Sequence, residues 1–284
     1  MKIKILVDSA SDIDLEEAKK LNIEMIPMEI GFGEDIFLDG VNLSYRQFYE
    51  KLIESSEIPK TSLINEFRFD EVFNRLIEEG FEVLCITMSS KLSGTFNAAQ
   101  KASEKYNGKV QVVDSLNVSI AERLLVLLAI RLREKGLSMQ EIVKELNNKK
   151  HNIHLLALLN TLKYLQKGGR ISAVKAFAGE IMNIKPVIAI VDGEVKLIGK
   201  AMGSKKGNNL LNQLIEKTGG IDFELPYATA YSGLNDDLLQ KYLIDSKFIW
   251  ENHTDKVPTY NIGSTIGTHA GPGAIAVAFY GKKI

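Results

Sequence analysis

Cysteine is almost missing from this chain, because Cys85 is the only one in 284 residues. A disulfide framework is therefore excluded, and a cysteine-rich metal site is excluded with it. Histidine is scarce as well, and no two histidines have the H-x-x-x-H spacing of a helical metal site, so we expect no metal and no metal cofactor. The four histidines are His151, His154, His253 and His269.

An excess of either charge is also missing, since 35 basic residues balance 36 acidic ones. Without a strongly basic surface, we expect no nucleic-acid partner. The most apolar helical segment, residues 120–132, is too short to span a bilayer and contains Glu122, Arg123 and Arg131. Residues 1–5 run directly into an expected strand, so we expect no signal peptide and a cytoplasmic location.

Several catalytic motifs are missing too. The chain has no G-x-S-x-G sequence and no Walker A sequence, which excludes the nucleophile elbow of α/β-hydrolases and the P-loop. Residues 271–276 fit G-x-G-x-x-A, but they precede an expected strand instead of opening a helix, so we reject a dinucleotide site. Asp8, Asp12 and Asp114 lie at expected strand ends, where we expect Asp12 to cap a helix and the others to cap loops instead of binding Mg²⁺.

Apolar runs of strand length alternate with amphipathic helical segments in the first half of the chain. This alternation is typical of a mainly parallel sheet with helices on both faces. Three strands end in polar pairs, Asp8-Ser9, Ser89-Ser90 and Asp114-Ser115, which we expect to line one edge of the sheet. We therefore predict a mainly parallel α/β domain over residues 1–150. Its expected strands are 4–8, 23–30, 83–88 and 109–114, and its expected helices are 15–22, 45–55, 69–80, 95–106, 119–136 and 138–149.

The pattern changes after the polar stretch 147–152. Asp192-Gly193 between two apolar runs is a strong β-hairpin signal, which favours antiparallel pairing. We therefore predict a second, mixed-sheet α/β domain over residues 151–284, with short segments that cross between the domains. Its expected strands are 153–159, 186–191, 194–198, 227–231 and 274–280, and its expected helix is 161–167.

The most distinctive stretch is the turn of residues 87–94, which joins an expected buried strand to an expected helix. Such a turn points several free N–H groups in one direction, with the positive end of the helix dipole behind them. Gly94 allows a ligand to approach the backbone closely. The turn suits a carboxylate or a phosphate, although Ser93 also fits a simple helix N-cap.

Four further segments carry polar groups or glycines in unusual density. They are Pro59-Lys60-Thr61-Ser62, residues 165–170 ending in Arg170, Ile184-Lys185-Pro186, and the glycine-dense turn 263–273 with His269. Each has an ordinary structural interpretation: an ion pair for Arg170, a satisfied structural histidine for His269, and turn or cap residues for Thr61 and Ser62.

Taken together, these segments resemble the DegV family over the whole length of the chain. The residues that carry the resemblance are Asp8-Ser9 with Asp12, Pro59-Lys60-Thr61-Ser62, Ser89-Ser90 with Leu92-Ser93-Gly94-Thr95, Tyr164-Leu165 with Lys167-Gly168-Gly169-Arg170, Lys185-Pro186, and Ile266-Gly267-Thr268-His269 with Gly271-Pro272-Gly273. The resemblance implies a bacterial, cytoplasmic, fatty-acid-binding protein of two α/β domains with the lipid between them. It also implies a separate ATP-dependent fatty acid kinase subunit, which phosphorylates the bound carboxylate for phospholipid synthesis.

The chemistry of the shared residues fits this role. A carboxylate needs several short donors, which Thr61, Ser62, Ser93 and the Gly94 N–H supply. Arg170 and His269 would add positive potential and orient the hydroxyl groups. We expect these two residues, although distant in sequence, to meet beside the Ser93 turn. The acyl tail would lie in an apolar tunnel, with no other cofactor.

One position departs from the family pattern. Met202 stands where relatives often have an arginine thought to contact the kinase subunit, although the neighbouring Lys200, Lys205 and Lys206 keep the region basic. Because lysine does not reproduce the planar fork of arginine, docking of the kinase through these lysines is a weaker inference than lipid binding.

Two other functions compete with the carrier interpretation. The first is an acyl- or phosphoryl-transfer enzyme, with Ser93 as nucleophile and His269 as base. The second is a membrane-surface protein, for which the balanced charge predicts only weak and transient contact.

Overall fold

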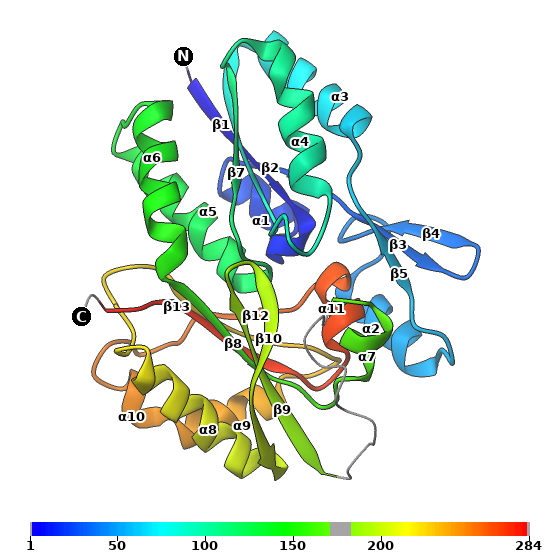
Figure 1. The fold of residues 1–284 in the computed structure, drawn as a ribbon, viewed down its shortest axis with the longest axis vertical. Coiled ribbons are helices and arrows are strands. Elements are labelled where there is room, and N and C mark those ends of the chain that lie inside the picture. Colours follow the sequence, from blue (N-terminus) through cyan, green and yellow to red (C-terminus); the bar gives the residue numbers. More distant parts are fainter. Residues whose placement is uncertain (1, 171–182, 283–284) are drawn as a thin grey trace.

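The computed structural model describes residues 2–170 and 183–282, whose strands form three sheets (Figure 1). The first sheet is parallel throughout, as the alternation of strands and helices predicts. At the carboxyl ends of three of its four strands lie the polar pairs that we expected along one edge. In sheet order its strands are β2 (Glu24–Ile26), β1 (Lys2–Asp8), β6 (Phe81–Thr87) and β7 (Val110–Asp114).

Helices cover both faces of this parallel sheet (Figure 1). Their starts follow from local sequence: Ser138 and Glu141 form a capping box, and Asn65 accepts a hydrogen bond from the Arg68 N–H. The flanking helices are α1 (Leu15–Lys20), α3 (Glu66–Glu78), α4 (Thr95–Ser103), α5 (Ser119–Glu134) and α6 (Met139–Lys149), with short 3₁₀ turns at Ser9–Ser11, Glu104–Tyr106 and Lys150–Asn152.

The second sheet is mixed, which confirms the predicted change of architecture. One pair, β11 with β12, is parallel and the other pairs are antiparallel. The predicted hairpin turns at Asp192 and Gly193, which both have positive φ. In sheet order the strands are β10 (Glu194–Met202), β9 (Ile184–Val191), β8 (Ile153–Leu158), β13 (Ile275–Tyr280), β11 (Tyr227–Tyr231) and β12 (Thr259–Asn261).

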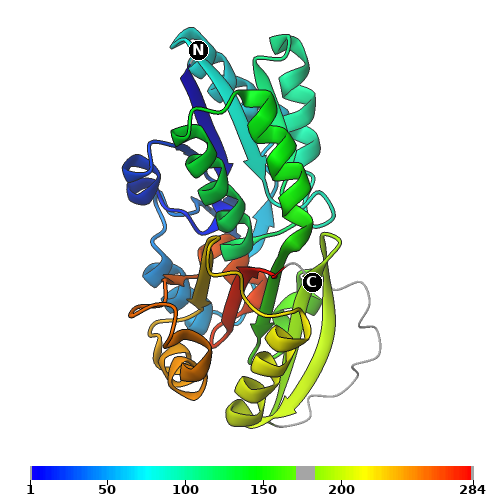
Figure 2. The same ribbon diagram turned by 90° about the vertical axis from the view of Figure 1, so that its left-hand side faces the viewer.

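Two sets of helices accompany the mixed sheet (Figure 2). One set packs on its outer face and consists of α8 (Gly203–Lys217), α9 (Asp237–Asp245) and α10 (Lys247–Trp250). The other set lies near the pocket and consists of α7 (Lys163–Lys167) and α11 (Ser264–Ala270). Among the described residues, no helix has both the length and the hydropathy needed to cross a membrane.

A third, small antiparallel sheet corrects one prediction. Residues 23–30 do not form a single strand, because β2 ends at Ile26 and a new strand begins at Glu29 in a different sheet. The chain leaves the parallel sheet at Pro27, because proline has no N–H to donate to a neighbouring strand. The small sheet consists of β4 (Asp35–Leu38), β3 (Glu29–Phe32) and β5 (Lys60–Ser62), and α2 (Tyr45–Glu54) lies beside it.

Two further predictions are corrected. The glycine-dense segment 263–273 is not a turn throughout, because it contains α11. Asp12 does not cap α1, the helix that follows it, because Asp14 is the N-cap of α1; the Asp12 carboxylate accepts hydrogen bonds from the Ser119 hydroxyl and the Gly263 N–H instead. Asp12 thus joins distant segments, a contact that local sequence cannot reveal.

One hydrophobic core runs through both large sheets. Side chains of the mixed sheet alternate between its faces, as the two-residue period of a strand requires. On β8, Leu155 and Ala157 join the core of the parallel sheet, whereas Leu156 and Leu158 pack on the outer face with α8. The strands of the parallel sheet precede residue 150 and those of the mixed sheet follow it, and the division into domains 1–150 and 151–284 stays a prediction.

Candidate functional site

A cavity of about 280 Å³ lies where the three sheets meet. Its wall is apolar along β8, β9, β10 and β13, and polar where β5, the turn after β6 and α11 come together. All six residues that we predicted for carboxylate binding line this one cavity, although they come from distant parts of the chain. They are Thr61, Ser62, Ser93, Gly94, Arg170 and His269.

The turn between β6 and α4 supplies one side of the polar end. Its N-cap residue is Gly94, not Ser93. The Ser93 hydroxyl lies 2.9 Å from the Thr95 hydroxyl and accepts a hydrogen bond from the Thr95 N–H at 3.3 Å. Ser93 therefore helps to start α4 and also faces the cavity, so the two interpretations of this serine are compatible.

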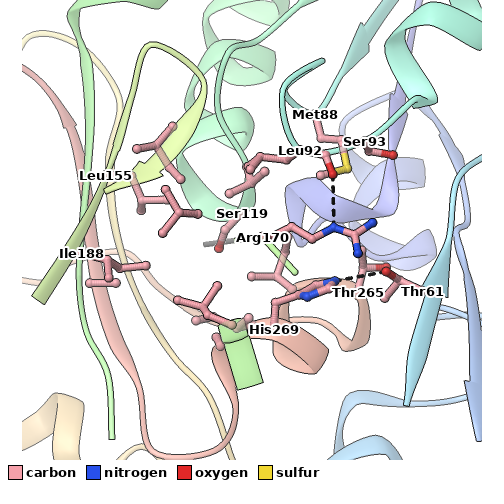
Figure 3. A pocket seen from close by; sticks show the side chains of 18 of the residues that line it. Thr61, Met88, Leu92, Ser93, Ser119, Leu155, Arg170, Ile188, Thr265 and His269 are labelled. Carbon is pink, nitrogen blue, oxygen red and sulfur yellow. Dashed lines mark hydrogen bonds between the residues drawn. The ribbon is translucent and has the colours of Figure 1, made fainter. Parts of the chain in front are cut away.

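Thr61 and His269 form the opposite side of the polar end. Thr61 lies on β5, and its Oγ1 is 3.1 Å from His269 Nε2, in the last turn of α11 (Figure 3). Burial lowers the pKa of His269 to about 4, and the positive charge of Arg170 adds to this effect. The imidazole is therefore neutral near pH 7 and orients the Thr61 hydroxyl without carrying charge, so our expectation that His269 adds positive potential is wrong.

Arg170 supplies the positive charge of the polar end. Its Nε donates to the Leu92 carbonyl at 3.4 Å, and its Nη1 donates to the Gly168 carbonyl at 2.6 Å. Figure 3 shows the guanidinium group between the Ser93 turn and the Thr61–His269 pair. The expected meeting of Arg170 and His269 beside Ser93 is thus observed, with an exposed guanidinium at the rim.

Two glycines allow the segments around His269 to interlock. A Cβ on Gly168 would lie 2.2 Å from His269 Nδ1, and a Cβ on Gly271 would lie 2.2 Å from the Tyr164 ring. Gly168 has an ordinary helical φ of −72°, so its role is to leave space for the imidazole and not to form a turn. Gly169, with φ +71°, provides the left-handed backbone conformation of the turn that precedes Arg170.

The apolar end of the cavity comes from one face of the mixed sheet. Leu155 and Ala157 of β8 lie beside Ile188 and Ile190 of β9, and Ala276 of β13 pairs with Ala157 across the strands. The alanines leave open the space that larger side chains would fill. Sequence reasoning did not identify these residues, because they look like ordinary core strand residues.

Other polar groups lie on the cavity wall or away from it. Ser119 and Thr265 also line the cavity, and we did not predict either of them. Both hydroxyls are hydrogen-bonded to buried aspartates. The predicted docking lysines are exposed elsewhere, Lys200 on β10 and Lys205 and Lys206 on α8.

The geometry disfavours the serine-enzyme interpretation. His269 hydrogen-bonds to Thr61, whereas the Ser93 hydroxyl hydrogen-bonds to Thr95. Within the described part of the chain, His269 Nδ1 is buried and has no hydrogen-bonding partner that could orient the ring as in a triad. In a catalytic pair the base hydrogen-bonds to the nucleophile, and the contacts of Ser93 and His269 differ from that arrangement.

The fold and the cavity define an α/β protein with a built pocket for a small molecule, mostly apolar and polar at one end. The model of the DegV family, described as a family of uncharacterised proteins, matches residues 2–282. The chain therefore belongs to the DegV family.

Relatives match over the full length of the chain. A DegV domain-containing protein of Clostridium perfringens is 32% identical, with 98% of each chain covered. Among solved structures, a DegV family protein from Thermus thermophilus described as binding fatty acid has a TM-score of 0.87 at 26% identity, with 99% of this chain and 100% of that chain covered. DegV of Bacillus subtilis, described as a fatty acid binding protein, has a TM-score of 0.82 at 27% identity, with 99% and 100% covered.

Proposed function

We propose that this protein binds one long-chain fatty acid and acts as a carrier without catalytic residues of its own. The observation that supports this most strongly is the position of the polar cluster: Ser93, Arg170 and the Thr61–His269 pair converge at one end of an apolar cavity. A fatty acid has the same division, with one carboxylate at the end of an alkyl chain. The fatty acids described for relatives support the same proposal.

The energetics of the two ends also support a fatty acid. Each buried methylene contributes about 0.8 kcal/mol, so a long tail outweighs the dehydration of its headgroup. A buried carboxylate without partners is costly, and hydroxyl donors with a guanidinium group reduce that cost. Thr61, Ser62, Ser93 and the Gly94 N–H are the proposed donors, and Arg170 provides the charge.

We further propose that a separate ATP-dependent kinase subunit phosphorylates the bound acid, which then enters phospholipid synthesis. The exposed residues Lys200, Lys205 and Lys206 form the proposed docking surface. Met202 beside them is 61% exposed, so an arginine at this position would reach solvent. If the three lysines are sufficient for docking, Met202→Arg should strengthen binding of the kinase subunit only slightly.

The proposed location is the cytoplasm, with transient contact with membranes during lipid exchange. The balanced charge of the chain supports weak and reversible contact. We expect little co-flotation with neutral liposomes, and stable flotation would contradict this part of the proposal.

Native mass spectrometry of the purified protein tests the central proposal. We expect a mass increment of one fatty acid, which delipidation removes and incubation with palmitic acid restores. Chemical analysis of the extracted ligand then gives its chain length and unsaturation. A delipidated, folded protein that takes up no fatty acid would rule the proposal out, and labelling of Ser93 by a fluorophosphonate would favour the serine enzyme.

A further inference from the structure

Helix α11, which carries His269, begins without a side-chain cap of its own. Its N-cap residue is Gly263, and no side-chain cap hydrogen bond is present there. Instead, carboxylates from distant segments accept its first N–H groups: Gly263 N–H donates to Asp12 at 2.8 Å, and Ser264 and Thr265 N–H donate to the two oxygens of Asp39 at 3.0 and 3.1 Å. The start of the helix is thus held by the N-terminal part of the chain.

Both carboxylates are themselves fixed in place. Asp39 is fully buried and Asp12 is 2% exposed. Asp39 also accepts a hydrogen bond from the Thr265 hydroxyl at 2.5 Å, and Asp12 accepts one from the Ser119 hydroxyl at 2.5 Å. A buried carboxylate with several donors has one favourable orientation, because every alternative leaves polar groups unpaired.

The same helix connects Asp39 to the polar end of the cavity. Thr265 and His269 are four residues apart, so they lie on the same face of α11, and both line the cavity. Close packing leaves the helix little freedom, since a Cβ on Gly267 would lie 2.7 Å from Phe48 and Tyr49 atoms. A displacement at the start of this short, rigid helix therefore reaches the Thr61–His269 hydrogen bond.

We infer that Asp39, assisted by Asp12, is a positioning residue for the carboxylate site and acts through α11 on His269. Both carboxylates accept hydrogen bonds from N–H groups at the start of α11. Neither carboxylate belongs to the described residues that line the cavity. The inference rests on the proposed function for its effect on binding. Its structural part, the orientation of the His269 ring, does not depend on any ligand.

The test compares Asp39→Asn with the matched control Asp14→Asn. Asp14 caps α1 by accepting the Glu17 N–H at 2.8 Å, and it is not among the described residues that line the cavity. Two quantities are measured on each folded variant: the Kd for palmitic acid by isothermal titration calorimetry, and the NMR resonances and pKa of the His269 imidazole in the delipidated protein. Asparagine still accepts one hydrogen bond at either position, but each variant loses the negative charge at a helix N-terminus, so both lose some thermal stability.

We expect Asp39→Asn to weaken palmitic acid binding about tenfold and to shift the His269 resonances, with the imidazole pKa rising toward its usual value as the ring becomes more exposed. Asp14→Asn should change neither quantity. If Asp39→Asn does not fold, Thr265→Val removes one hydrogen bond to Asp39 and should shift the same resonances by a smaller amount.

A folded Asp39→Asn protein with unchanged His269 resonances and an unchanged Kd would overturn the inference. Equal losses of affinity in Asp39→Asn and Asp14→Asn would do the same, since they would indicate a general loss of stability. If the unmodified protein fails to bind palmitic acid, the proposed function fails, while the His269 resonances of the delipidated variants still test the role of Asp39.

Discussion

The two ends of the cavity are built in different ways. The polar end depends on a few side chains from separated segments, each held by specific hydrogen bonds, such as the 3.1 Å contact between Thr61 and His269. The apolar end depends on one continuous sheet face, where Leu155, Ala157 and Ile188 are all apolar and differ only in size and shape. Ligand affinity should therefore depend on hydrogen-bonding groups at the polar end and on side-chain volume at the apolar end. A substitution should reduce affinity in a way that shows which end it changes.

The largest expected effect comes from filling the apolar end. Ala157→Phe places a ring where methylenes of the ligand would lie, and the loss of about four methylene contacts at about 0.8 kcal/mol each corresponds to roughly 200-fold weaker palmitic acid binding. Octanoic acid should lose less affinity than palmitic acid in the same variant, as titration calorimetry will show. Equal losses for both acids would contradict a volume-controlled tail site.

A smaller effect is expected from removing a donor at the polar end. Ser93→Ala deletes a hydroxyl that would form a charge-assisted hydrogen bond, worth roughly 1.5–3 kcal/mol, so palmitic acid affinity should fall by about one to two orders of magnitude. Octanoic and palmitic acids should be affected equally. Ser90→Ala, in the same turn but outside the cavity wall, is the control, and an unchanged Kd for Ser93→Ala would exclude Ser93 from the site.

A still smaller effect is expected from displacing His269 without removing it. Gly168→Ala places a methyl group within 2.2 Å of His269 Nδ1, so the ring must move away from Thr61. We expect affinity for palmitic acid to fall about tenfold, within the range of one lost hydrogen bond. Gly31→Ala is the control, because its new Cβ meets no atom closer than 3.9 Å. An unmoved His269 resonance in Gly168→Ala would refute the packing argument.

The smallest effect on binding is expected from pH. Since the pKa of His269 is lowered to about 4, the ring stays neutral, and His269 should contribute no change in palmitic acid affinity between pH 6 and 8. The unfolded state binds its proton near pH 6.5, so this histidine favours folding above that pH, and its contribution disappears as pH falls toward 4.

Unfolding measurements isolate this contribution. The difference in the free energy of unfolding between the natural protein and His269→Gln should shrink by roughly 3 kcal/mol as pH falls from 7 to 4. Taking the difference between the two proteins cancels the opposite trend expected from Asp8 and Asp12, whose pKa values burial raises to about 7. A gap that is independent of pH would show that His269 titrates normally.

The comparison between the two ends also explains what the sequence could predict. The polar end could be predicted because Ser93, Arg170 and His269 stand out beside glycines in segments shared with a family. The parallel sheet and the Asp192-Gly193 hairpin could be predicted because strand period and turn chemistry are local. These features require no knowledge of which distant segments meet.

The rest depended on tertiary contacts. Ala157 could not be assigned to the cavity, because an alanine in a core strand looks the same whether it faces a ligand or another side chain. Pro27 is a local signal for a break after β2, but the placement of β3 in a different sheet depends on its pairing with β4 and β5. Asp39 had no local signal, since its partners Ser264 and Thr265 lie more than 220 residues away in the chain.

Because the core is continuous with the cavity wall, a bound ligand should affect how fast the protein is degraded in the cell. Leu155, Ala157 and Ile188 belong to the same cluster as Ile5 and Leu84 of the parallel sheet, so a bound tail would complete the interior. At a concentration 100 times its Kd, such a ligand adds about 2.7 kcal/mol to the free energy of unfolding. Protein molecules without a ligand would unfold more often, so proteases would degrade them first. The abundance of this protein should therefore rise and fall with the supply of fatty acid, even at a constant rate of synthesis.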